Sequence, residues 1–158
     1  LKRARSAHIA TCHLSGRTHP DPFALDAAIC DTLQAHDVQV VCLAGYMKKL
    51  GPQTLSVYHR RVLNVHPALL PNHGGQGFYG ERVHAAVLAA GDTVSGVTVH
   101  LVDGEYDQGP VVDQQTVPVE PDDTVERLAA RVLAVEHVFY PVTLQKIARG
   151  QIDLDAVG

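Results

Sequence analysis

Apolar runs of strand length alternate with segments of helical periodicity through the first half of the chain. Residues 38–44 form a nearly continuous apolar run, which predicts a strand buried on both faces. Residues 22–36 repeat apolar positions at three- and four-residue steps, which predicts a helix with Asp21 as its N-cap. A short helix after Pro52 and a strand that ends near His66 continue the pattern. Because strands alternate with helices, this half predicts a parallel sheet.

The second half of the chain has a different texture. Residues 79–90 predict a helix that stops at Gly91. Two strand-like runs, 94–102 and 111–119, are joined by an acidic loop and predict later strands that pair partly antiparallel. A long final helix is predicted from Asp122 to about residue 150. Its expected inner stripe consists of Val125, Leu128, Val132, Val135 and Val138.

The front of the chain begins abruptly. Residues 1–7 are basic and helix-like, but no cap residue or strand comes before them, and residues 9–14 predict a short strand. We therefore expect residues 1–158 to form a single domain that is incomplete at its N-terminus.

Composition narrows the functional classes. The net charge of −4 and the absence of a Lys/Arg run argue against a nucleic-acid partner. No apolar run approaches the roughly 20 residues of a membrane span, so no membrane partner is expected. The three cysteines, Cys12, Cys30 and Cys42, are far apart in apolar runs, which indicates free thiols and a cytoplasmic location.

Asn64 and His66 are the first candidates for chemistry. They lie two residues apart at a strand end, so both side chains point to the same side of the sheet. Ligand crevices of open α/β folds lie at the carboxyl ends of strands. An amide can donate a hydrogen bond to an oxyanion, and an imidazole can move a proton near neutral pH. The alternative is a strand that frays into a proline-containing loop.

Asp107, in the acidic loop, is the carboxylate best placed to complete such a site. Next to an imidazole it would orient the ring or raise its pKa. Taken alone, an acidic residue in such a loop is more often a solvated turn residue. His100 stands among valines in a strand, where a core histidine is the usual interpretation. The other histidines lack metal-site spacing, and neither phosphate-loop nor GxSxG motifs occur, so no metal is predicted.

Four segments taken together resemble the glycinamide ribonucleotide transformylase (phosphoribosylglycinamide formyltransferase) family. They are Leu-Ala-Gly-Tyr-Met at 43–47, Asn-Val-His-Pro-Ala-Leu-Leu-Pro at 64–71, Gly-Val-Thr-Val-His at 96–100, and Asp-Gln-Gly-Pro at 107–110. Their order and spacing match the family from residue 1 to about residue 150.

This resemblance implies a Rossmann-like α/β fold with a mostly parallel sheet and helices on both faces. It implies transfer of the formyl group of 10-formyltetrahydrofolate, a co-substrate, to the amine of glycinamide ribonucleotide in de novo purine biosynthesis. The catalytic Asn, His and Asp of the family fall on Asn64, His66 and Asp107. His100 matches a family position near the site, and the Leu70–Pro71 peptide bond is expected to be cis.

The resemblance also implies binding residues. The amine-bearing nucleotide would meet Glu136 and the adjacent stretch. The folate pocket would be formed by Met47, Lys48, Lys49, Leu50, Val62, Asp103, Gly104, Glu105 and Tyr106, and the nucleotide contacts by Leu133, Ala134, Val135 and Glu136.

The implied mechanism begins with attack of a neutral amine on the formyl carbon. Asn64 and a protonated His66 would stabilise the resulting oxyanion. Asp107 would raise the pKa of His66 and, through a water molecule, help move a proton from the attacking nitrogen to the departing folate nitrogen.

The chain departs from the family pattern at its front and in two segments. The first strand and the phosphate-binding loop of the family would precede Leu1. Pro22 stands where the family has an Arg and cannot supply the charge of that side chain. Residues 72–82 are a longer variant of the corresponding family segment.

Three other functions compete with this interpretation. Formyltetrahydrofolate deformylase shares the three catalytic residues and uses water as acceptor, but its loop usually has a second His where this chain has Pro67. Methionyl-tRNA formyltransferase would need a C-terminal RNA-binding domain and lacks a match to His100. A non-catalytic folate-binding domain would not need an intact Asn-His-Asp set. For the assembly, we expect a monomer or a homodimer.

Overall fold

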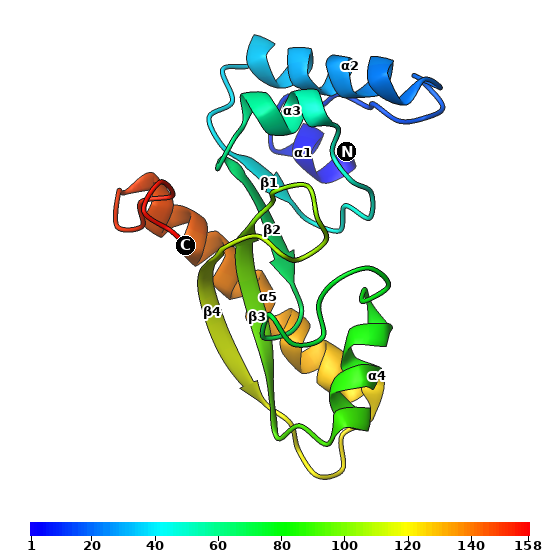
Figure 1. The fold of residues 1–158 in the computed structure, drawn as a ribbon, viewed down its shortest axis with the longest axis vertical. Coiled ribbons are helices and arrows are strands. Elements are labelled where there is room, and N and C mark those ends of the chain that lie inside the picture. The colour runs from blue at the N-terminus through cyan, green and yellow to red at the C-terminus, as the bar shows by residue number, and fades with distance from the viewer.

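The computed structural model describes residues 1–158, which form four strands and five helices (Figure 1). None of the helices combines the length and hydropathy that crossing a bilayer requires. In chain order the elements are α1 (Lys2–Ser6), α2 (Pro22–Ala35), β1 (Val41–Leu43), α3 (Pro52–Val57), β2 (Val62–His66), α4 (Glu81–Ala90), β3 (Val94–Leu101), β4 (Val111–Pro118) and α5 (Val125–Ala148).

The four strands make one sheet in the order β1-β2-β3-β4. β1 and β2 pair in parallel, with Val41 opposite Val62. β2 and β3 pair antiparallel, and so do β3 and β4. The predicted α/β class is therefore confirmed, with a parallel start and antiparallel later strands. Within the described residues the parallel part is the β1–β2 pair.

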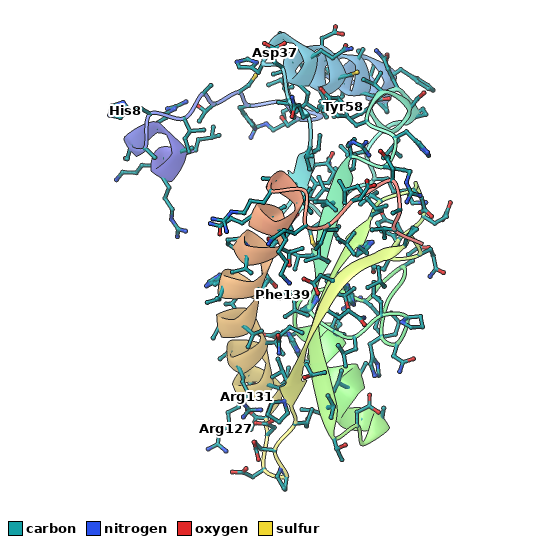
Figure 2. The ribbon with its side chains drawn as sticks, turned by 90° about the vertical axis from the view of Figure 1, so that its left-hand side faces the viewer. His8, Asp37, Tyr58, Arg127, Arg131 and Phe139 are labelled. Atoms are coloured by element: carbon teal, nitrogen blue, oxygen red, sulfur yellow. The ribbon has the colours of Figure 1, made fainter.

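Alternation along β2 separates two layers of packing. Leu63 belongs to the main core, which α4 and α5 cover with Val87, Leu128 and Val132. Val62 faces the opposite side, where it packs with Leu50 and Tyr58 beneath residues of α2 and α3. Figure 1 shows α2 and α3 at one end of the molecule, and Figure 2 shows α5 lying along the sheet. The prediction of helices on both faces is confirmed.

Two strand predictions need correction. Residues 9–14 form no strand, and Ile9 is 61% exposed. An extended segment needs a partner strand for its backbone groups, and this one has none. The strand predicted at 38–44 shortens to Val41–Leu43, which is the edge strand of the sheet, and it is not buried on both faces because Cys42 is exposed.

The stripe of α5 is correct at its start and wrong at its end. Leu128 and Val132 are fully buried, but Val138 is 67% exposed and Phe139 is buried in its place. In Figure 2, Phe139 lies between α5 and the sheet. A period of 3.6 residues advances the inner face by four positions from Val135 to Phe139, which a three-residue step missed.

The junction between α2 and α3 depends on one buried acid. As predicted, Asp21 caps α2, accepting hydrogen bonds from the amides of the first turn. Within α2, the Asp26 side chain is buried and caps the neighbouring helix α3. Its carboxylate accepts from the Gln53 amide at 2.8 Å, the Thr54 amide at 3.1 Å and the Thr54 hydroxyl at 2.5 Å. A Cβ at Gly51 would collide with this carboxylate, so the close contact requires glycine there.

Candidate active site

The end of β2 presents its polar side chains to a polar row on β3. Asn64 is paired with His100 and His66 with Thr98 in the antiparallel register. These four side chains share one face of the sheet, while the intervening Leu63 and Val65 face the main core. The sheet therefore concentrates polar groups on the face opposite its largest apolar cluster.

The loop between β3 and β4 brings Asp107 to this row. Asp107 adopts a left-handed backbone conformation, with φ at 55°. Two residues later, a Cβ at Gly109 would clash with the Leu101 carbonyl, so the return of the chain to β4 requires glycine. The loop thereby places a carboxylate that the sequence alone could not distinguish from a solvated turn residue.

His66 has an acceptor beside each ring nitrogen. Nε2 donates to the backbone carbonyl of His73 at 2.8 Å, so this nitrogen carries the proton in the neutral ring. Nδ1 lies 3.4 Å from Oδ2 of Asp107. A lone pair and a carboxylate therefore face each other, and a proton taken up by Nδ1 would point toward the carboxylate. Proton exchange by His66 is thus directed to Nδ1.

Burial controls the charge of this ring. Burial lowers the pKa of His66 below its ordinary value, while the Asp107 carboxylate and the His73 carbonyl oppose the shift without cancelling it. We expected Asp107 to raise this pKa. The carboxylate does act in that direction, but desolvation of a side chain that is only 3% exposed outweighs it. His66 is therefore mostly neutral near pH 7.

Asp107 stays ionised. Burial acts to raise its pKa, but His100, His66 and the Gly75 amide together lower that pKa below the ordinary value. Its Oδ2 accepts from the Gly75 amide at 3.0 Å, and its Oδ1 lies 3.4 Å from Nε2 of His100. A fixed negative charge thus stands beside the nitrogen of His66 that can gain a proton.

His100 lies close to both the Asn64 side-chain amide and the Asp107 carboxylate. Its Nδ1 donates to the Leu101 carbonyl at 2.9 Å, and in the tautomer with its proton on Nδ1 alone, Nε2 is an acceptor. The side-chain nitrogen of Asn64 lies 3.2 Å from this Nε2. The bond holds one N–H of Asn64 and leaves the other free for an oxyanion. The structure therefore brings the predicted Asn64, His66, Asp107 and His100 together.

Two residues that the sequence analysis missed hold the turn after His66. The Thr98 hydroxyl, fully buried, donates to the Ala68 carbonyl at 2.6 Å and accepts from the Leu70 amide at 3.0 Å. Gln114 donates to the Leu70 carbonyl and to Thr98. The Leu70–Pro71 bond is cis, as expected. The signal for Thr98 was its two-residue step from His100 on the face opposite Val97 and Val99.

Most of the predicted folate residues surround a small cavity beside Asn64, His100 and Asp107. The cavity measures about 50 Å³, well below the roughly 300 Å³ at which ligand pockets usually begin. A wider open hollow of about 480 Å³ adjoins it and shares three of its lining residues. The cavity is lined by the predicted Lys48, Lys49, Leu50, Gly104, Glu105 and Tyr106.

A pair of charged side chains lies between the cavity and the hollow. Lys49 forms an ion pair with Glu105 at 3.0 Å and lies over the Tyr106 ring, 5.0 Å from its centroid. Both charged groups are exposed, so this ion pair is weak and can break reversibly. Space for a ligand larger than the cavity requires these side chains to move.

Three other predicted folate residues do not line the cavity. Met47 is 58% exposed, and Val62 is fully buried in the apolar cluster below, with Leu50. Asp103 accepts a hydrogen bond from the Glu105 amide, so it shapes the loop. Their direct contact with folate stays a prediction.

The predicted nucleotide contacts lie on α5. Leu133 is 47% exposed, Ala134 is exposed, and Val135 and Glu136 are half-buried. Burial raises the pKa of Glu136, and its carboxylate forms no hydrogen bond or ion pair. No side-chain hydrogen bond or ion pair joins this stretch to the four clustered side chains, so its binding role also stays a prediction.

Comparison with known proteins decides the family. Residues 1–144 match the family described as formyl transferase. The chain belongs to the formyl transferase family. The resemblance to glycinamide ribonucleotide transformylases is confirmed by a solved relative, transformylase 1 from Symbiobacterium toebii. That structure is 41% identical, with a TM-score of 0.85, and the match covers 94% of this chain and 68% of the relative.

Other relatives match this chain over different shares of their own lengths. The chloroplastic phosphoribosylglycinamide formyltransferase of Vigna unguiculata is 44% identical over 78% of this chain and 40% of the relative. The phosphoribosylglycinamide formyltransferase of Bacillus subtilis is 32% identical over 93% of this chain and 73% of the relative. A Pseudomonas syringae formyltetrahydrofolate deformylase is lower, at 27% identity and a TM-score of 0.69. The chain thus spans less than half of the chloroplastic relative and 15% of a trifunctional Bos taurus protein.

Proposed function

We propose that this formyl transferase moves the formyl group of 10-formyltetrahydrofolate to the amine of glycinamide ribonucleotide, a step of de novo purine biosynthesis. The observation that carries the proposal is the cluster of Asn64, His66 and Asp107, with His66 Nδ1 facing the Asp107 carboxylate at 3.4 Å. The family and the transformylase relatives support the same reaction.

In this proposal, each catalytic residue has one task. Formyl-folate supplies the activated formyl carbon. Asn64 donates its free N–H to the oxygen that becomes negative, because its other N–H is engaged by His100. His66 takes up and returns a proton at Nδ1, and the nearby Asp107 charge favours the imidazolium while it exists. Nε2 keeps its proton throughout, on the His73 carbonyl.

The residues present fit a folate in chemical character. The cavity is lined by both polar and apolar residues, and the Lys49–Glu105 pair can open toward the wider hollow. We propose that the pterin enters here, with the predicted loop from Asp103 to Tyr106 against it, and that Glu136 and residues 133–135 meet the nucleotide.

Other parts of the proposal rest on the sequence. We expect small-molecule substrates alone, with no nucleic-acid or membrane partner, and either a monomer or a homodimer. The free cysteines favour a cytoplasmic location.

One assay tests the proposed reaction. The purified chain is supplied with 10-formyltetrahydrofolate, with and without glycinamide ribonucleotide, and loss of the formyl group is followed by absorbance. Consumption that needs the amine supports the transferase. Consumption with water alone would assign the hydrolase activity of a deformylase instead. Tight folate binding without turnover would leave only a binding domain.

Lys49→Ala is expected to raise KM for formyl-folate about 2- to 10-fold with little change in kcat. The side chain lines the cavity and its mouth but does not reach the reacting groups, so it contributes equally to ground state and transition state. Lys2→Ala on α1, an exposed lysine far from the cavity in sequence, is the control and should leave both constants unchanged. A fall in kcat at constant KM would contradict this role of Lys49.

A further inference from the structure

The loop of residues 72–77 touches both titrating catalytic side chains through its backbone. The His73 carbonyl accepts from Nε2 of His66, and the Gly75 amide donates to Oδ2 of Asp107. The acid–base pair therefore depends on where this loop lies. Any contact that fixes the loop also fixes the two groups that exchange protons.

The loop has little else to hold it. Three of its six residues are glycine, and Gly75 and Gly77 have positive φ, as His73 does. The two bonds to the catalytic pair come from the loop backbone. The loop side chains make one hydrogen bond to a residue outside the loop. In that bond, Nε2 of His73 lies 2.6 Å from Oδ2 of Asp92. The His73 ring also lies near the Phe78 ring, with centroids 6.5 Å apart.

Asp92 is a firm anchor. It follows Gly91, the left-handed cap of α4, and its amide donates to the Val87 carbonyl at 3.3 Å. The next residues lead directly into β3, the strand that carries His100. The His73 side chain is 16% exposed and that of Asp92 37% exposed, so solvent screens this pair only partly. It ties the loop to the frame between α4 and β3.

We propose that the His73–Asp92 pair positions the catalytic His66, by holding the His73 carbonyl against Nε2 so that protons are exchanged at Nδ1. His73 and Asp92 are thus positioning residues for the proposed formyl transfer, and this inference rests on that function. Without the pair, the loop moves and the carbonyl leaves Nε2. The neutral ring is then free to place its proton on Nδ1, toward Asp107, where it blocks uptake of another proton.

Three side chains act on the charge of His66 besides the His73 carbonyl. Asp107 favours the imidazolium, whereas His100 and His73 oppose it. His84, buried on α4, feels the charge of His66, and burial lowers its own pKa. Since the His73 carbonyl stabilises the protonated ring, losing it removes one of the two favourable contacts and lowers the pKa of His66 further.

The test is a nitrogen NMR titration of the histidine rings in the ligand-free chain, combined with steady-state kinetics. In Asp92→Ala we expect His66 to show a mixture of Nδ1–H and Nε2–H tautomers and a pKa lower by about 0.5–1 unit. We expect kcat to fall about 10-fold while KM for formyl-folate stays within about 2-fold. Asp92→Asn keeps an acceptor oxygen and should recover most of both properties.

Asp122→Ala, which removes the exposed partner of Arg127, is the matched control and should change neither readout. An unchanged tautomer and pKa of His66 in Asp92→Ala would overturn the inference, whatever the rate. A purely structural role would lower stability without moving the titration. If the wild-type chain transfers no formyl group, the proposed function fails, but the titration still tests the loop.

Discussion

Replacing His66 by Ala is expected to lower kcat for formyl transfer by about 10²–10³-fold. The variant loses the group that exchanges a proton at Nδ1, and no other side chain replaces it, because His100 is held by Asn64 and the Leu101 carbonyl. KM should change little, since the imidazole acts mainly in the transition state. Steady-state kinetics with both substrates measures the effect.

The protein should remain folded in this variant. His66 contributes one hydrogen bond to a backbone carbonyl, so the free energy of unfolding should fall by no more than about 2 kcal/mol. His59→Ala, at an exposed histidine before β2, is the matched control and should keep wild-type rates. Asp107→Asn, which keeps the shape of the carboxylate without its charge, should also lose most activity. Near-wild-type turnover in either His66→Ala or Asp107→Asn would refute the catalytic assignment.

Replacing Asp26 by Ala should destabilise the domain by about 2–4 kcal/mol. The substitution removes the acceptor for two backbone amides at the start of α3 and for the Thr54 hydroxyl, and both donors of Thr54 are buried. For a chain of this size, the melting temperature should drop by about 5–15 °C. Thermal and urea unfolding followed by circular dichroism measure the change.

Two further variants make this prediction specific. Asp31→Ala lies on the same helix at an exposed position and should shift the melting temperature by no more than 1–2 °C or so. Asp26→Asn retains one acceptor oxygen and should fall between wild type and Asp26→Ala. If Asp26→Ala and Asp31→Ala melted together, the buried cap would contribute nothing and the explanation would be wrong.

Local patterns predicted the elements that are long or strongly periodic. The helix after Asp21 and the antiparallel pair of later strands are confirmed. Their signals, which are a helix cap, a hydrophobic period and a turn, each lie within a few neighbouring residues. Residues 9–14 failed for the opposite reason. A strand exists only if another strand lies beside it, and no local pattern reports that neighbour.

The candidate site was predictable in its members but not in its supports. Asn64 and His66 stand two residues apart, so their shared face follows from strand geometry alone. The meeting of Asp107 with His66 depends on a loop conformation, so the sequence offered Asp107 as a candidate and the family resemblance supported it. The carbonyl of His73 was out of reach, since backbone groups leave no mark on side-chain patterns. The sign of the His66 pKa shift required knowing how deeply the ring is buried.

The five residues of β2 serve the candidate site on one face of the sheet and the main core on the other. Its even-numbered positions hold Val62, Asn64 and His66, and its odd-numbered positions hold Leu63 and Val65, which the main core needs. A slip of one residue in its pairing would drive an amide and an imidazole into apolar packing and expose the leucine. Molecules in which this strand pairs in the wrong register are therefore both inactive and unstable. Cellular quality control that removes unfolded chains then also removes these inactive ones. Specific activity per folded molecule should then stay constant even where expression is poor.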